Sequence, residues 1–156
     1  MADNENISFL QRSKIQSETL VPVVAAFEKE IGKERSHAIV SKALRDSTRN
    51  FYENIRNGFE SNPIDLIAGG LSMFAEDGAL DYEILNQTEG SFDLNITRCS
   101  YAEFYKELGR PDFGYICLCD LDFTIAECLG SDIEFKRTQT IMEGAPHCDY
   151  RYRIKK

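Results

Sequence analysis

The sequence predicts an α+β fold, in which N-terminal helices pack on a small, mostly antiparallel sheet of about four strands. Two observations carry this prediction. Apolar residues recur at helical spacing through the first half of the chain, and from about residue 79 they alternate with polar residues as in strands. A chain of 156 residues also fits one domain that buries a core without disulfides or metal. We therefore expect a single domain over 1–156, mainly helical over 1–76, with a hairpin, two helices and two strands over 79–156.

The first expected helix covers residues 4–32. Asn4 or Asn6 would cap its N-terminus, because a side-chain oxygen there can accept hydrogen bonds from free backbone N–H groups. Pro22 removes one backbone donor, so we expect a kink or a new helix at that point. Gly32 is the expected stop.

Two more helices are expected before residue 76. Apolar residues at helical spacing predict one over 34–57. Asn62 followed by proline predicts the start of another, which ends near residue 75. Gly69 and Gly70 lie inside this last helix and predict close approach by another segment.

The period changes in the second half. Alternating runs over 80–84 and 92–96, joined by a turn containing Gly90, predict a β-hairpin. Ser100 and Glu103 have the spacing of a capping box that opens a short helix. The remaining elements are expected to be a helix over 112–129 and strands over 132–141 and 147–154.

Composition excludes some partners. The chain has 26 acidic and 18 basic side chains, a net charge of −8, which argues against a nucleic-acid partner. No apolar run approaches the roughly 20 residues that span a bilayer, and we expect no membrane partner and no secretory signal. Five cysteines are a poor disulfide framework, so a reducing cytoplasm is the expected location.

Reactive residue types concentrate between residues 115 and 151. Cys117 and Asp120 are three residues apart, which places them on one face of a helix. Cys119 and Asp122 form a second such pair on a neighbouring stripe. A loop over 142–146 then leads to His147 and Cys148. The other histidine, His37, lies far from this cluster in the sequence and is expected at the surface.

The same region resembles a known family. The residues that carry the resemblance are Tyr105-Lys106-Glu107-Leu108-Gly109, Cys117-Leu118-Cys119-Asp120, Phe135-Lys136-Arg137-Thr138-Gln139-Thr140, Gly144 and Cys148-Asp149-Tyr150-Arg151. As a set they are similar to the L-2-amino-thiazoline-4-carboxylic acid hydrolase family, over about residues 100 to 153. The resemblance implies hydrolytic opening of a cyclic, amidine-like 2-aminothiazoline ring in a bacterial route to cysteine. It implies a small-molecule carboxylate as substrate, and we expect no metal and no cofactor.

Such a reaction needs an activated nucleophile, a proton donor for the leaving atom and an anchor for the substrate carboxylate. A thiolate can attack directly, or a carboxylate can activate water, and the sequence leaves both routes open. We assign Cys117 as nucleophile or polariser, Asp120 as general base and Cys148 as its thiol neighbour. Arginine binds carboxylates with two parallel hydrogen bonds, which suits Arg137 as anchor. The other expected substrate-binding residues are Thr138, Thr140, Asp149 and Arg151.

Two other kinds of site stay open. Cys117, Cys119, His147 and Cys148 offer a ligand set that suits tetrahedral zinc, although their spacing on a helix and a strand does not bring them together. A non-catalytic binding module is the second alternative, because 7 tyrosines and 10 phenylalanines are enough to line a ligand cavity as well as a core. The helical stripes over 7–55 can equally form a dimer face, so a homo-oligomer is possible.

Overall fold

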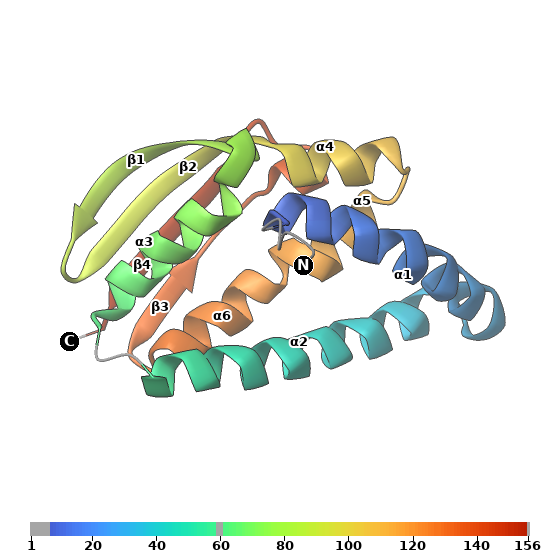
Figure 1. Ribbon diagram of the computed structural model, residues 1–156, viewed down its shortest axis with the longest axis horizontal. Helices are drawn as coiled ribbons and strands as arrows, with labels where there is room; N and C mark the ends of the chain where they lie inside the picture. The colour runs from blue at the N-terminus through green and yellow to red at the C-terminus, as the bar shows by residue number, and fades with distance from the viewer. Residues whose placement is uncertain (1–6, 59–60, 156) are drawn as a thin grey trace, which may run out of the picture.

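The computed structural model describes residues 7–58 and 61–155, and it confirms the α+β fold class. One four-stranded sheet has the strand order β1-β2-β4-β3, with every neighbouring pair antiparallel (Figure 1). The strands are β1 (Leu80–Thr88), β2 (Ser91–Cys99), β3 (Ile133–Lys136) and β4 (Cys148–Ile154).

Helices precede the sheet and also connect β2 to β3. The α-helices are α1 (Phe9–Ile31), α2 (Lys33–Gly58), α3 (Pro63–Phe74), α4 (Ser100–Glu107), α5 (Pro111–Gly114) and α6 (Leu121–Leu129). Two short 3-10 turns, η1 (Glu76–Gly78) and η3 (Ile141–Glu143), and a π-helical turn, η2 (Tyr115–Cys119), complete the described elements.

The N-terminal helix begins later than expected. The backbone N–H of Gln11 donates to Ser8 Oγ at 3.4 Å, and the Gln11 side chain accepts from the Ser8 backbone, which together form a capping box. Asn4 and Asn6, the expected caps, lie outside the described residues. Helix α1 runs past Pro22 to Ile31, so Pro22 does not start a new helix.

Helix α4 also begins differently from the prediction. Its N-cap is Cys99, whose Sγ accepts from the backbone N–H of Ala102 at 3.4 Å. The capping box expected at Ser100 is therefore wrong. Glu103 instead accepts a hydrogen bond from Arg98 at 2.8 Å, which ties the helix to the end of β2.

The helix expected over 112–129 is broken into three parts, α5, η2 and α6. Within η2 the backbone N–H of Asp120 donates to the carbonyl of Tyr115 at 2.9 Å, a span of five residues. Such a turn holds more residues than an α-helical turn. Cys117 and Asp120, three residues apart across this turn, therefore no longer share a face, and this decides where the Asp120 side chain points.

Strand β3 is less than half as long as expected, because its continuation bonds elsewhere. The backbone N–H groups of Thr138 and Gln139 donate to the Asp149 carboxylate at 2.8 Å and 3.0 Å instead of extending the strand. The close approach expected at Gly69 and Gly70 is also wrong, since nothing lies within 4 Å of a Cβ built at either residue. At Gly70 that open space belongs to the cavity described below.

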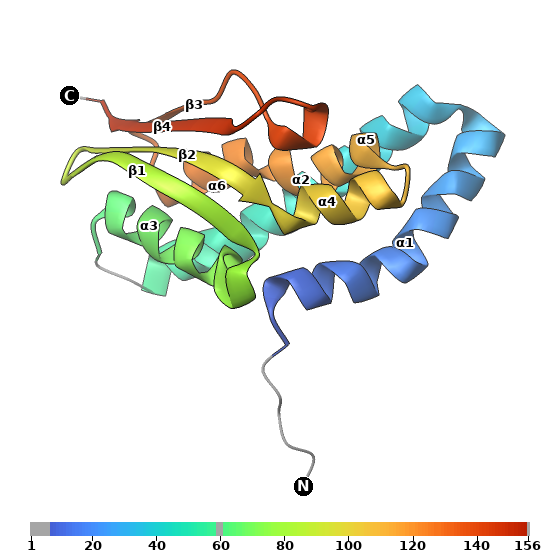
Figure 2. The same cartoon turned by 90° about the horizontal axis from the view of Figure 1, so that it is seen from above.

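Helices α3 and α6 cover one face of the sheet, and the main core lies between them and the strands (Figure 2). Phe92, Leu94 and Ile96 of β2 point into this core. The neighbouring side chains of β2 and β4 lie on the opposite face, where Arg153 pairs with Asp93. A second core cluster joins α1, α4, α5 and η3. In the described part of the chain, no helix is long and apolar enough to cross a membrane.

Candidate functional site

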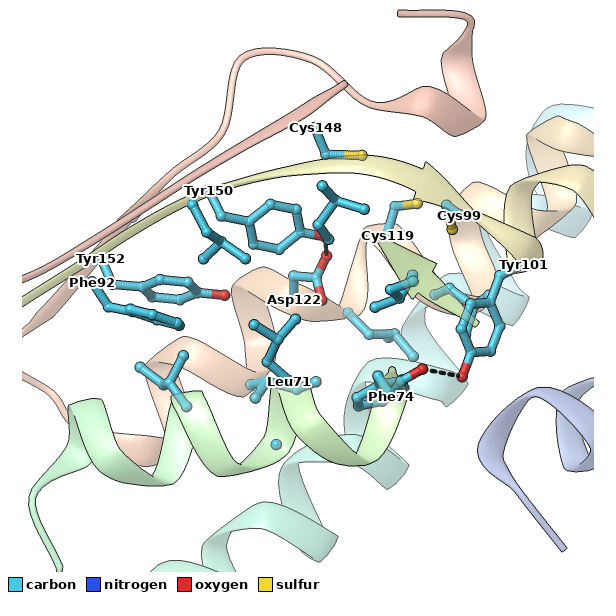
Figure 3. A pocket seen from close by; sticks show the side chains of 18 of the residues that line it. Leu71, Phe74, Phe92, Cys99, Tyr101, Cys119, Asp122, Cys148, Tyr150 and Tyr152 are labelled. Carbon is cyan, nitrogen blue, oxygen red and sulfur yellow. Dashed lines mark hydrogen bonds between the residues drawn. The ribbon is translucent and has the colours of Figure 1, made fainter. Parts of the chain in front are cut away.

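A cavity of about 170 Å³ lies between α3, the sheet and the η2–α6 segment (Figure 3). Most of its wall is apolar or aromatic. Leu71 and Phe74 of α3 form one side, and Phe92 and Tyr152 of the sheet form the opposite side. A hollow with mainly apolar walls and a few polar groups is typical of a small-molecule site.

Asp122, at the start of α6, brings a carboxylate to this cavity. Its Oδ2 accepts from the Tyr150 hydroxyl at 2.6 Å and from Arg137 Nη1 at 2.5 Å. No described residue donates to its Oδ1. The Asp122 side chain keeps 24% of its surface exposed, and the residue lines the cavity.

Burial raises the pKa of Asp122 to about 6, from 3.8, although Arg137 and Tyr150 act in the lowering direction. A carboxyl group with a pKa close to neutrality can both accept and return a proton under ordinary conditions. Among the described residues that line the cavity, Asp122 is the one with a charged side chain.

Arg137 lies behind Asp122 rather than in the cavity wall. Its side chain is 2% exposed. The guanidinium carbon lies 5.1 to 5.8 Å from the ring centroids of Tyr115, Phe123, Phe135 and Tyr150. The guanidinium therefore makes its interactions with these four rings and with the Asp122 carboxylate. The structure thus places Arg137 as the partner of a carboxylate within the protein.

Four thiols line the cavity, from Cys99, Cys117, Cys119 and Cys148. Burial raises the pKa of Cys99 to about 11 and that of Cys117 to about 12, and it also raises the pKa of Cys119 and Cys148. All four are therefore protonated near neutral pH. A thiol is a poor nucleophile compared with a thiolate.

Asp120 points away from the cavity. Its Oδ2 accepts from Ser41 Oγ at 3.0 Å and from Arg45 at 2.9 and 2.6 Å, so it binds helix α2. The π-helical turn explains this placement, because it separates the faces of Cys117 and Asp120. Cys119 and Asp122, by contrast, both reach the cavity wall.

The remaining predicted substrate-binding residues lie outside the cavity. Thr138 Oγ1 donates to Asp149 at 2.6 Å. Thr140 Oγ1 donates to Glu143 at 2.8 Å and caps η3. Arg151 donates to the Leu94 carbonyl at 2.8 Å, on the sheet face away from the helices. Of the predicted site residues, the structure brings Cys117 and Cys148 to the same cavity.

The proposed zinc ligands do not meet. Among the described residues, the one group of three potential ligands within 4.8 Å of one another is Glu28, His37 and Asp112. This group already has cations of its own, because Arg110 contacts Glu28 at 2.6 Å and Lys33 contacts Asp112 at 2.7 Å. It is a charge-balanced contact between α1, α2 and α5. The surface position expected for His37 is wrong, since its side chain is 15% exposed and contacts Glu28.

The sequence contained signals for the residues that the prediction missed. Asp122 follows Cys119 by three residues, the spacing of neighbours on one helix face. Tyr150 and Tyr152 follow Cys148 at intervals of two, so the three share one face of β4. The sequence alone does not show that these two faces meet in the folded protein.

Fold and cavity together define a class: an α+β protein with a small, mainly apolar cavity between a helical layer and one face of an antiparallel sheet. The chain belongs to the L-2-amino-thiazoline-4-carboxylic acid hydrolase family, whose model matches residues 12–152. The family match extends over nearly the whole chain, well beyond the region that carried the resemblance in the sequence.

Among solved structures, the fold is similar to the phenol-responsive sensory domain of the transcription activator PoxR, determined with phenol. The TM-score is 0.54 at 11% sequence identity, and the alignment covers 86% of this chain and 72% of the sensory domain. At this identity the similarity concerns the fold. Among curated proteins, no sequence matches the chain.

Proposed function

We propose that this protein hydrolyses a small cyclic amidine in the cavity, with Asp122 as general base and then general acid. The observation that carries the proposal is the Asp122 carboxylate, which presents to a mainly apolar cavity one oxygen that accepts no hydrogen bond from any described residue. Family membership supports a hydrolase. The pKa of about 6 suits a group that must take up and return a proton.

The reaction can be written with balanced atoms. Asp122 Oδ1 accepts a proton from water as the water oxygen bonds to the amidine carbon of the ring. The ring bond from that carbon to nitrogen then breaks as the added hydroxyl becomes a carbonyl. Asp122 passes both protons of the former water, one after the other, to the departing nitrogen, which leaves as an amine. Tyr150 and Arg137, both bound to Oδ2, hold the carboxylate in place throughout.

Between the two routes that the sequence left open, we favour the carboxylate over the thiol. The raised pKa of Cys117 keeps its sulfur protonated, and Asp120 is bound to Arg45 and Ser41 rather than near that sulfur. The thiols then serve as small apolar side chains that shape the cavity. The single domain and the cytoplasmic location remain predictions of the sequence.

Ligand binding without catalysis is the second candidate. The observation in its favour is the cavity wall, in which Asp122 is the one charged side chain among the described residues. The sensory domain of similar fold was determined with phenol, a small aromatic molecule. Both candidate functions use the same cavity. They differ in whether Asp122 catalyses a reaction of the bound molecule.

A hydrolysis assay on cyclic amidines separates them. We expect wild type to open the ring, Asp122→Asn to lose at least about 100-fold in kcat as expected when a general base is removed, and Asp120→Asn to retain activity. Asp120 is the matched control, since it is a carboxylate two residues away that faces helix α2. Turnover that survives in Asp122→Asn and disappears in Asp120→Asn would reverse the assignment. Binding without turnover in wild type would favour the second candidate.

A further inference from the structure

Helix α1 lies at the edge of the molecule, and one side of it faces away from the rest of the chain (Figure 2). Ser17 and Val24 mark its inner side, since both are buried. Ser17 Oγ lies 2.8 Å from the Tyr105 hydroxyl of α4, and Val24 belongs to the second core cluster. Successive residues of an α-helix are about 100° apart around its axis, so Thr19 and Val23 lie on the outer side. Both are exposed.

A line of six residues runs along this outer side with alternating spacings of four and three, the spacing at which two helices pack side by side. All six residues are exposed. The two ends of the line are charged, and the four residues between them carry no charge. Exposed Ile15, Leu20 and Phe27 flank the line and add apolar surface. We call this line the outer seam: Arg12, Gln16, Thr19, Val23, Ala26 and Glu30.

The outer seam carries opposite charges at its two ends, Arg12 at one and Glu30 at the other. Among the described residues, neither takes part in a salt bridge. If two copies of the helix pack antiparallel about a two-fold axis, Arg12 of each copy meets Glu30 of the other. The same axis places Thr19 opposite Val23 of the second copy, because both pairs are centred on the same point of the helix. A parallel arrangement instead brings like charges together at both ends.

This pattern favours a second copy over other occupants of the seam. The distance from Arg12 to Glu30 along the helix is about 27 Å, at a rise of 1.5 Å per residue. An apolar ligand or a lipid surface would cover Val23 and its neighbours but would leave the two end charges without partners. An antiparallel copy covers the apolar surface and pairs both charges at once, which is the self-complementarity that a two-fold interface requires. Contiguous apolar surface is in any case uncommon on monomers.

We propose that two copies of this chain associate through the outer seam of α1, with the two helices antiparallel and with Arg12 paired to Glu30 of the second copy at both ends. Small and uncharged residues at the centre of the seam let the helices approach closely, and the flanking apolar residues pack across the axis. None of the seam residues lines the cavity. The inference is therefore independent of the proposed hydrolase function, and either can fail without the other.

Opposite charge reversals in two separate variants test this arrangement. Sedimentation velocity at about 50 mM salt, where screening is weak, measures the dissociation constant of each dimer. Arg12→Glu and Glu30→Arg should each raise that constant at least about tenfold, because each variant places like charges together at both ends of the contact. An equimolar mixture of the two variants should recover a dimer about as tight as that of wild type. In the mixed dimer the two glutamates of one copy meet the two arginines of the other.

Lys14→Glu and Glu18→Arg are the matched controls. They make the same changes of charge on exposed positions of α1 away from the outer seam, and both should dimerise as wild type does. Circular dichroism establishes that every variant is folded.

Three results would overturn the proposal. One is wild type that sediments as a monomer, and another is a pair of seam variants that dimerise as tightly as wild type. The third is a mixture of folded seam variants that stays dissociated, since the contact would then be parallel or lie elsewhere. Controls that dissociate as readily as the seam variants would attribute the effect to net charge and overturn the proposal as well.

Discussion

The hydroxyl of Tyr150 donates a hydrogen bond of 2.6 Å to Asp122 Oδ2, and this contact joins the last strand to helix α6. The two residues are 28 positions apart in the sequence. Since Arg137 binds the same oxygen, the carboxylate is fixed by one oxygen and leaves the other to the cavity. The contact orients the group on which the proposed chemistry depends.

Removing that hydroxyl should shift the pH profile of the reaction. The hydrogen bond from Tyr150 lowers the pKa of Asp122, so in Tyr150→Phe the pKa should rise above about 6. A general base must be ionised, and half-maximal kcat/KM should therefore move upward by about one pH unit. The measurement is kcat/KM from pH 4.5 to 9, with Tyr82→Phe as control. A profile that coincides with that of wild type would argue against Asp122 as the base.

Because the Asp122 carboxyl group is buried, the free energy of unfolding should depend on pH. Its pKa is 3.8 when unperturbed and about 6 in the folded protein, so the folded state holds the proton more tightly. The contribution of this group to stability therefore falls as pH rises from about 4 to 6, by about 3 kcal/mol in all. Asp122→Asn cannot ionise and should lack this fall.

Urea unfolding at pH 4 and at pH 7 measures the effect. The difference in unfolding free energy, Asp122→Asn minus wild type, should be larger at pH 7 than at pH 4. Taking the difference removes the contribution of other titrating groups that the two proteins share. A difference that stays constant or falls would show that Asp122 is not buried in its charged form.

Two adjacent glycines in α3 offer a matched test of the cavity. A Cβ at Gly69 or Gly70 meets nothing within 4 Å, and alanine in a helix interior is favoured over glycine by about 1 kcal/mol. Both Gly69→Ala and Gly70→Ala should therefore raise the melting temperature by a few degrees. Gly70 lines the cavity, so only Gly70→Ala should weaken ligand binding. Equal binding by both variants would mean that the ligand occupies another place.

Helix α1 carries an apolar stripe that the described chain leaves uncovered. Val23 and Phe27 are 45% and 51% exposed, and Leu20 and Ile31 extend the stripe at helical spacing. Contiguous apolar surface of this kind is uncommon on monomers. The homo-oligomer that the sequence left open remains a prediction, and this stripe is the surface we expect a second copy to cover.

Sedimentation velocity tests this expectation. Wild type should sediment as a dimer, and the double variant Val23→Ser/Phe27→Ser should sediment as a folded monomer. Glu18→Ser, on the opposite side of the same helix, should leave the dimer intact. A monomeric wild type would rule out this use of the stripe.

Local patterns predicted most of the elements. Alternation over 80–96 predicted the hairpin, and helical spacing predicted α2 to within one residue of each end. The failures occurred where a distant partner competes with the local preference. Asp149 takes the backbone donors that would have extended β3, and the π-helical turn interrupts a segment that has the apolar spacing of one helix.

The sequence by itself determined the fold class and the family, and it pointed to segments that line the cavity, because periodicity and short motifs are local properties. Only the tertiary structure decided which carboxylate meets the cavity. Asp120 and Asp122 are the same residue type and lie two residues apart in the sequence. After the π-helical turn, which holds one residue more than an α-helical turn, the Asp120 carboxylate contacts Arg45 and the Asp122 carboxylate contacts Tyr150. Their ionisation follows from that placement, since the pKa of a carboxyl group depends on the water and charges around it.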